Sequence, residues 1–259
     1  MSREYSKSTY DRFESGLESV LTEGDIIENP HTAAVKLRTL VEERGIQSRE
    51  AREYLANSGI RKKWNTLFAT DRAQVLGRWI SPWLRDYQPA ADVMAGDCIL
   101  TGEIADLLGA DIIAFEHLGH YPEIRGHSRV RPVDLHGDLE TMANWGIRLS
   151  ASSALLCAVL HHEEEPEALL RYTLKTGIRR IIVVENCVDT HNTSEFHHLM
   201  DMFFNRCLND FGSSCTRQHR TQSDWISLVE NIGLRLVFTD ELQTVPALPF
   251  PHQLMIFDF

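Results

Sequence analysis

Gly96 and Glu116 are the residues of this chain whose types and spacing point most directly to nucleotide chemistry. Gly96 follows an apolar run that begins at Ala90, and a residue without a side chain there lets a ligand approach the backbone N–H groups of a helix N-terminus. Glu116 comes about 20 residues later, at the end of a second apolar run, where a carboxylate can accept hydrogen bonds from both hydroxyls of a ribose. The pair predicts a nucleoside site.

The elements that must position this pair are well marked in segment 90–117. The pattern predicts a buried strand, a tight turn, a short helix and a second strand that closes on Glu116. Gly109 ends the helix, because glycine readily adopts the left-handed conformation of a helix C-terminus. Together these elements are half of a nucleotide-binding α/β unit.

Further strands and helices alternate along the rest of the chain, which predicts a parallel sheet with helices on both faces. The expected strands are 130–138, 154–160, 181–184, 234–238 and 253–257, the last two as a terminal hairpin. The expected helices are 139–145, 163–177, 194–211 and 223–232. The insertion 186–232 is longer than a simple crossover, so we expect it to build the substrate side of the site.

The amino-terminal third reads as helical throughout. Apolar residues recur at helical spacing in 10–21, 30–45, 48–58 and 64–87. Pro82 is expected to kink or divide the last of these helices. We therefore predict a helical cap or lid over residues 1–88 and a catalytic domain over 89–259.

The composition narrows the class of partner. Of 259 residues, 26 are Lys or Arg and 37 are Asp or Glu, and the resulting charge of −11 without a basic patch argues against nucleic acid. The five cysteines are odd in number and form no CxxC pair, which is typical of a reducing compartment. No apolar stretch approaches the ~20 residues that span a bilayer. We expect a cytoplasmic protein with a small-molecule substrate and no membrane partner. The sequence does not determine the oligomeric state, and a homodimer is one possibility.

Twelve histidines raise the question of a metal, which the spacing does not favour. His161 and His162 are adjacent and would point to opposite sides of a strand, and His197 and His198 would diverge by roughly 100° on a helix. No HxxxH pair is present, so no metal site is expected.

A polar stripe follows these histidines on the predicted helix 194–211. Asp201, Asn205 and Asn209 recur at every fourth position, which is typical of a solvated helix face. If that helix lined the cleft, the same stripe would bind a polar acceptor.

At this point the chain resembles the class I S-adenosylmethionine (SAM)-dependent methyltransferases of the small-molecule type. The resemblance covers roughly residues 85–259 and rests on 91–117, on LLCAVLHHEEEPEALL at 155–170, on IIVVEN at 181–186 and on the terminal strand pair. It implies a Rossmann-like, seven-stranded sheet whose last strand is antiparallel, with SAM as cofactor. The family's first loop carries three alternate glycines, and here those places hold Met94, Gly96 and Cys98.

The resemblance also implies where each part of the site lies. The methionine part of SAM would lie against 92–98, its ribose on Glu116 and its adenine near Asp138 and Leu139, with Asp134 as the other candidate acid. The implied cofactor contacts are Asp92, Ala95, Gly96, Cys98, Glu116, His117, Asp138, Leu139 and Leu160.

Methyl transfer to an O–H or N–H group requires a base, and a histidine with a near-neutral pKa suits that role. His161 stands where the family's acceptor approaches, so it is the first candidate, followed by Glu185 and His219. Glu185 could equally cap the next turn. The candidate acceptor-binding residues are His162, Asn186, Asn205 and Arg220.

Three functions remain open at this stage. The favoured one is in-line methyl transfer to a small polar metabolite. The second is intramolecular cyclisation of SAM to azetidine-2-carboxylate with release of methylthioadenosine, which the altered glycine loop motivates. The third is a non-catalytic SAM-binding module. A nicotinamide-binding fold fits the glycine pattern less well.

Overall fold

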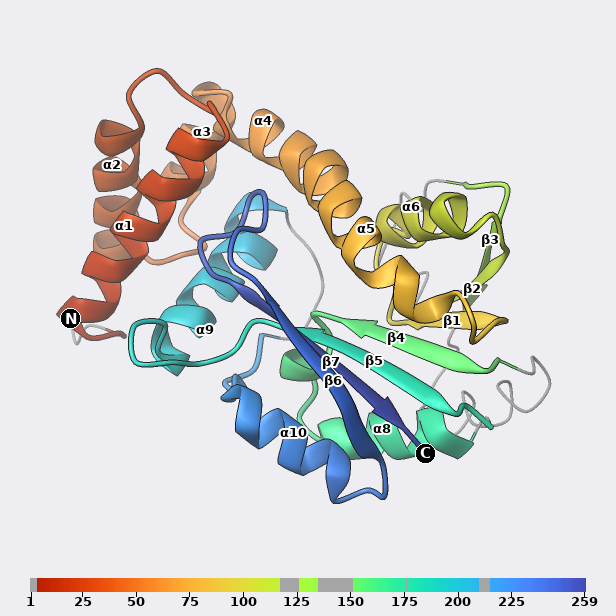
Figure 1. Ribbon diagram of the computed structural model, residues 1–259. Coiled ribbons are helices and arrows are strands. Elements are labelled where there is room, and N and C mark those ends of the chain that lie inside the picture. Colours follow the sequence, from red (N-terminus) through yellow and green to blue (C-terminus); the bar gives the residue numbers. More distant parts are fainter. Residues whose placement is uncertain (1–3, 117–125, 135–150, 176, 210–214) are drawn as a thin grey trace.

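A twisted sheet runs through the middle of the chain (Figure 1). The computed structural model describes residues 4–116, 126–134, 151–175, 177–209 and 215–259. Within these ranges the strands are β1 Ala90–Val93, β2 Ile112–Glu116, β3 Val130–Asp134, β4 Ser153–Cys157, β5 Arg180–Glu185, β6 Arg235–Leu242 and β7 His252–Asp258. These strands form one seven-stranded sheet in the order β3-β2-β1-β4-β5-β7-β6.

The pairing directions give this sheet its functional edge. Strands β1 to β5 are parallel to one another, and β7 is antiparallel to both β5 and β6. The strand order reverses between β1 and β4, and the carboxyl ends of β1, β2, β4 and β5 meet at one edge, where ligands of such sheets bind. The predicted doubly wound sheet with an antiparallel last strand is confirmed.

Helices cover both faces of the sheet. α5 Ala73–Leu84 and α6 Ile99–Leu108 lie on one face, and α8 Pro166–Lys175 and α10 Gln222–Glu230 lie on the other (Figure 1). Because side chains alternate along a strand, each buried strand contributes side chains to the hydrophobic layers on both faces of the sheet. Ala90 packs with the α5 and α6 side, and its neighbour Ala91 packs with the α8 and α10 side.

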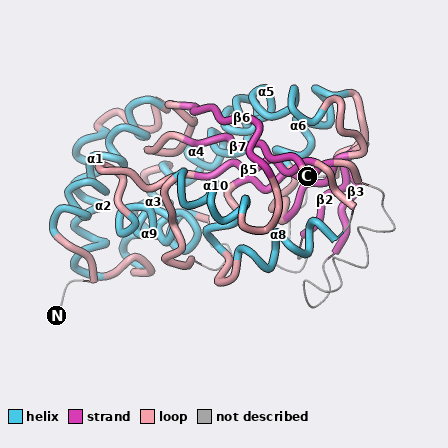
Figure 2. The backbone as a smooth tube through the Cα atoms, turned by 60° about the horizontal axis from the view of Figure 1, so that its bottom comes forward, coloured by secondary structure: helices cyan, strands magenta, loops and turns pink. Residues whose placement is uncertain are grey.

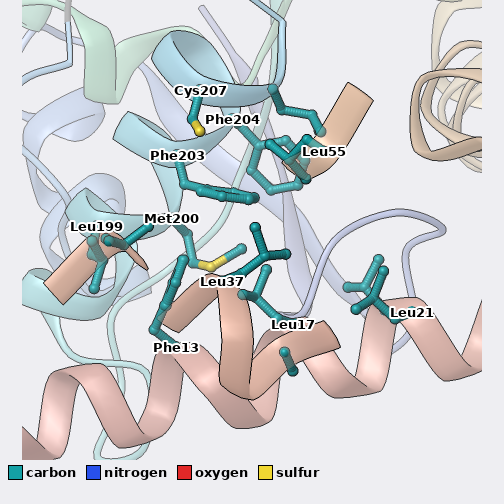
Figure 3. Packing of buried hydrophobic residues seen from close by; sticks show 14 of the residues in the cluster. Phe13, Leu17, Leu21, Leu37, Leu55, Leu199, Met200, Phe203, Phe204 and Cys207 are labelled. Carbon is teal, nitrogen blue, oxygen red and sulfur yellow. The ribbon is translucent and has the colours of Figure 1, made fainter. Parts of the chain in front are cut away.

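A second hydrophobic core joins the amino-terminal helices to the insertion after β5. Helices α1 Lys7–Glu23, α2 Pro30–Arg44, α3 Arg49–Asn57 and α4 Ile60–Leu67 enclose α9 Ser194–Met202 and the π-helical turn η4 Phe203–Leu208. Phe13 packs edge-on against Phe203, with ring centroids 5.2 Å apart, and Leu37 and Leu55 close the same cluster (Figure 3). In Figure 2 these helices gather at the end of the molecule away from β2 and β3.

The long helical stretch after α4 departs from the prediction at Pro82. The interruption lies at η1 Phe68–Arg72, one π-helical turn that joins α4 to α5, and α5 continues through Pro82 to Leu84. A π-helical turn inside a helix shifts the register of the following side chains, and such turns are frequent at functional sites. The prediction that Pro82 divides this helix is therefore wrong.

The chain also ends its fourth strand earlier than predicted. β4 stops at Cys157, because Ala158 takes a left-handed conformation with φ of 57°, and a 3-10 turn, η3 Leu160–His162, follows. The terminal hairpin of β6 and β7 is confirmed. The predicted helix 139–145 and the end of strand 130–138 lie outside the described residues.

Candidate functional site

A cavity of about 480 Å³ opens at the carboxyl edge of the sheet. Its floor is formed by residues at or just after the carboxyl ends of β1, β2 and β4, among them Gly96, Glu116 and His161. Residues of η1, α9 and η4 also line the cavity, among them Arg72 and Asp201. The cavity thus lies between the sheet and the helical region, within the size range of small-molecule sites.

The turn after β1 has the shape of a glycine-rich loop although it has one glycine. Met94, Gly96 and Cys98 all have positive φ, at 60°, 62° and 61°. A left-handed residue with a side chain costs roughly 1–2 kcal/mol, so the loop keeps its geometry at the expense of strain. Gly96 N–H donates to the Glu116 carboxylate at 2.7 Å, which ties the turn to the end of β2.

Asp92 lies buried at the base of this turn. Its carboxylate accepts a hydrogen bond from the Thr101 hydroxyl at 2.6 Å. Burial, together with the nearby Glu116 charge, raises the pKa of Asp92 to about 7, against the opposing effect of the Thr101 bond. The Cys98 thiol is 1% exposed, and burial raises its pKa to about 12, so it is a packed and unreactive thiol.

His161 and Glu185 form a buried pair on the other side of the cavity. His161 Nδ1 lies 2.6 Å from Glu185 Oε2, while Oε1 accepts hydrogen bonds from the backbone N–H groups of Val159 at 3.0 Å and Leu160 at 2.7 Å. Burial lowers the pKa of His161, but the carboxylates of Glu185 and Asp201 outweigh it, so the pKa of His161 lies above its ordinary value. Glu185 therefore fixes the orientation of the imidazole and leaves Nε2 directed elsewhere.

The polar stripe of α9 and η4 faces the cavity. Asp201, Asn205 and Asn209 all line it, so the expectation of a solvated helix face is wrong. Asn205 Nδ2 donates to Asp201 Oδ1 at 2.6 Å. The helix turns its polar face inward because its apolar face is used by the core that it shares with α1 to α4.

The adjacent histidines also lie differently from the prediction. In the 3-10 turn the rings of His161 and His162 have centroids 4.1 Å apart, since the chain is not extended there. His162 Nδ1 lies 3.7 Å from Asp201 Oδ2 and His161 Nε2 lies 3.9 Å from Asp201 Oδ1. The argument that these two histidines point opposite ways on a strand is wrong.

Behind His161 lies a stack of further imidazoles. The His219 ring stacks on His161 with centroids 4.8 Å apart and on His197 at 5.2 Å. Burial lowers the pKa of His219 far below its ordinary value and that of His197 to about 4, so both rings are neutral. Asn186 lines the cavity and donates its amide N–H to His197 Nδ1 at 2.9 Å.

Some predicted site residues stand outside the cavity wall. The described residues that line the cavity do not include Cys98, Leu160, Glu185, His219 or Arg220. Asp92, Ala95, Gly96, Glu116, His161, His162, Asn186 and Asn205 do line it. His117, Asp138 and Leu139 lie outside the described residues.

Arg72 is a cavity residue that the sequence analysis missed. It is 9% exposed, its guanidinium stacks over the Phe68 ring at 4.5 Å, and its Nε has no hydrogen-bond partner among the described residues. The sequence does carry a signal, because Arg72 interrupts an otherwise apolar series at every fourth position that includes Trp64 and Leu76. A buried cation in such a series indicates that a ligand or partner supplies the opposite charge.

The strand order, the antiparallel β7 and the ligand edge define the fold of the class I SAM-dependent methyltransferases. None of the helices in the described ranges has the length and apolarity needed to cross a bilayer. No family model and no curated protein sequence matches the chain.

The solved structures that share this fold include the following three. The mitomycin 7-O-methyltransferase MmcR aligns over 96% of this chain and 68% of its own, with 18% identity and a TM-score of 0.53. TnmH aligns over 92% and 69%, with 17% identity and a TM-score of 0.50. Human N-acetylserotonin methyltransferase, in complex with SAM, aligns over 89% and 67%, with 16% identity and a TM-score of 0.50. Identities this low establish the fold alone.

Proposed function

We propose that this chain is a SAM-dependent methyltransferase that acts on a small polar metabolite by in-line methyl transfer. The observation that carries the proposal is a cavity lined both by the Gly96–Glu116 turn and by His161, whose ring is held from outside the cavity by Glu185. SAM supplies an already activated methyl group. The chain must then align donor and acceptor, exclude water and accept a proton.

The cofactor end has the features that a nucleoside with an amino acid tail requires. Gly96 lines the cavity in a left-handed turn without a side chain, and Glu116 at the end of β2 is proposed to accept hydrogen bonds from the ribose hydroxyls. Asp92 and Ala95 complete this wall of the cavity. Cys98 and Leu160 shape it from behind, and His117, Asp138 and Leu139 remain proposed contacts of the adenosine.

Arg72 suits the carboxylate of the cofactor's methionine part. Its guanidinium is buried in the cavity wall with an unpartnered Nε, and an isolated buried charge is costly. A carboxylate ligand would accept two parallel hydrogen bonds from it. Arg72 is therefore the proposed partner of that carboxylate.

At the acceptor end His161 is the proposed general base. Glu185 bonds to Nδ1, so Nε2 is the nitrogen that takes the proton from the acceptor. Glu185 touches no cavity space and acts as a positioning residue through His161 and the backbone of the η3 turn. His162, Asn186 and Asn205 are the proposed acceptor contacts.

His219 and Arg220 have a less direct place in the proposal. The His219 ring stacks on that of His161. Because the pKa of His219 is lowered, this ring is neutral and adds no positive charge beside the proposed base. Arg220 lies over the Trp225 ring at 5.4 Å, on the α10 side. Both are proposed to support the acceptor wall from behind, and a cytoplasmic homodimer remains an expectation of the sequence.

The test is to incubate the purified protein with SAM and follow the products by liquid chromatography and mass spectrometry. We expect one SAM to bind per chain and to persist, with S-adenosylhomocysteine forming only when a panel of hydroxylated and amine-bearing small molecules is added. Methylthioadenosine formed from SAM alone would overturn methyl transfer in favour of the intramolecular reaction. Absence of SAM binding at millimolar concentration would overturn the cofactor. The comparisons support neither alternative function.

A further inference from the structure

We propose that His161, His162 and Asp201 form a binding site for a divalent transition metal ion, with Zn²⁺ as the defining probe. Zn²⁺ held there would occupy the nitrogen that the acceptor's proton needs and so would inhibit the enzyme. The binding part stands by itself, and the inhibition part rests on the proposed function.

The three side chains place their donor atoms around one point. His161 Nε2 lies 3.9 Å from Asp201 Oδ1, and His162 Nδ1 lies 3.7 Å from Asp201 Oδ2. One donor atom from each residue lies within 4.8 Å of the other two. Zinc bonds of about 2.0–2.1 Å in tetrahedral geometry separate neighbouring ligand atoms by about 3.4 Å, so small side-chain rotations complete the site.

An unpartnered oxygen provides a second and independent indication of a ligand. Asp201 is 9% exposed, and its Oδ2 has no hydrogen-bond partner among the described residues. Asn205 bonds to the other oxygen, Oδ1, at 2.6 Å, which holds the carboxylate in place with Oδ2 near His162 Nδ1 and Oδ1 near His161 Nε2. Leaving a buried carboxylate oxygen without a donor costs free energy that a metal ion would recover.

The contact that His161 makes through its Nδ1 is of the kind that histidine ligands of metal ions make with neighbouring residues. Histidines that bind metals usually pass their second ring nitrogen to a carboxylate, which fixes the ring and strengthens the bond to the metal. Glu185 makes that contact with Nδ1 at 2.6 Å, and the N–H groups of Val159 and Leu160 hold Glu185. Nε2 is thereby directed toward Asp201 and the cavity.

The donor set selects the kind of ion. Two imidazole nitrogens with one carboxylate suit Zn²⁺, Co²⁺ or Fe²⁺ better than Mg²⁺ or Ca²⁺, which prefer oxygen ligands. All three residues line the cavity, so further coordination positions face the space that the acceptor would fill. A metal there therefore competes with acid–base chemistry at His161.

The experiment titrates chelator-treated, full-length protein with Zn²⁺ by calorimetry and with Co²⁺ by visible absorption, in the absence of SAM. We expect one ion per chain and a cobalt spectrum with nitrogen ligands. His162→Gln and Asp201→Asn should each weaken Zn²⁺ binding by at least about tenfold, since each removes one of three ligands. His191→Gln, an exposed histidine outside the cavity, is the matched control and should bind as the parent does.

Two results would overturn the site. One is the absence of stoichiometric Zn²⁺ binding by the parent protein. The other is equal binding by the parent, His162→Gln and Asp201→Asn in samples that circular dichroism shows to be folded. His162 has a side chain that is 21% exposed, so its variant is the safer test of the two.

The failure of this inference can be told from the failure of the proposed function. Zn²⁺ and Co²⁺ binding is read without cofactor or acceptor, so it survives if no methyl transfer is found. Methyl transfer that is measured, and is unaffected by Zn²⁺ at saturation of the site, would overturn the inhibition while leaving the enzyme assignment intact.

Discussion

The two ends of the cavity are built in different ways. The proposed cofactor end comes from one continuous segment, 90–116, and owes its shape to the backbone of a left-handed turn. The proposed base end is assembled from η3, β5 and α9, and owes its shape to side-chain hydrogen bonds on Glu185 and Asp201. The difference teaches that the proposed binding geometry is encoded locally, whereas the arrangement around the proposed base depends on long-range packing. Five predictions test this difference between the two ends.

The largest expected effect is at His161. His161→Gln keeps an amide N–H that can donate to Glu185 but removes the basic nitrogen, so we expect kcat to fall by about 10²–10⁴-fold. The dissociation constant for SAM should change less than about twofold, because the cofactor end is separate. Calorimetry with SAM and a steady-state assay measure the two quantities. His191→Gln serves as the control, and an unchanged kcat would refute the role of His161.

Glu185→Gln tests whether the base end depends on one buried acceptor. With the amide oxygen on the two backbone N–H groups, the amide N–H group meets His161 Nδ1, so the charge-assisted hydrogen bonds are lost and the imidazole must carry its proton on Nε2. We expect the free energy of unfolding to fall by about 2–3 kcal/mol, measured by urea denaturation. An unchanged stability would mean that the η3 turn holds itself without Glu185. Glu164→Gln, at an exposed position between η3 and α8, is the control.

The two ends also differ in how much of their structure could be predicted from the sequence. The strand, turn, helix and strand of 90–116 were predicted with Gly109 and Glu116 in place, because periodicity and helix-end signals are local. The left-handed Met94 and Cys98 were not predictable, since propensity reserves that conformation for glycine. The loop keeps it because Glu116 and the packing around Cys98 hold it from outside.

At the base end the residues could be predicted from the sequence, but their arrangement could not. His161 and Glu185 were candidates, yet their pairing depends on β4 and β5 lying side by side and on the left-handed Ala158. The inward face of Asp201 and Asn205 depends on which side of α9 the amino-terminal helices cover. No periodicity distinguishes a solvated polar face from one that lines a cavity.

Asp92 makes the cofactor end sensitive to pH. Its pKa is about 7 in the folded protein against 3.8 as its ordinary value, so the folded state binds the proton more tightly. This contribution to stability is complete below about pH 4 and is lost as the pH rises to about 7. The interval corresponds to roughly 4 kcal/mol as an upper limit, and we expect about 2.

The measurement compares the parent with Asp92→Asn, which keeps an acceptor for Thr101 and does not titrate. Urea denaturation without SAM at pH 5 and pH 8 should show the variant gaining stability relative to the parent at the higher pH. A constant difference between the two proteins across that range would show that Asp92 is ionised in the folded state.

Glu116→Gln should weaken SAM binding and spare the chemical step. The substitution removes the charge that strengthens hydrogen bonds to ribose hydroxyls, so we expect the dissociation constant for SAM to rise about tenfold. At saturating SAM the kcat should be close to that of the parent. This pattern is the opposite of that of His161→Gln, and Asp106→Asn on the exposed side of α6 is the control. A kcat loss at saturation would mean that the two ends are coupled.

The smallest effect concerns Ala158, a strained residue at the base end. Ala158 has φ of 57°, which costs an L-residue roughly 1–2 kcal/mol, whereas glycine in the unfolded chain costs about 0.5–1 kcal/mol of extra entropy. Ala158→Gly should therefore stabilise the protein by about 0.5 kcal/mol, seen as a rise of one or two degrees in Tm. Ala154→Gly, four residues earlier in the extended β4 and fully buried, should lower Tm because it loses packing and gains no relief. If both variants lower Tm alike, the base end stores no backbone strain, and strain would then be a property of the cofactor turn alone.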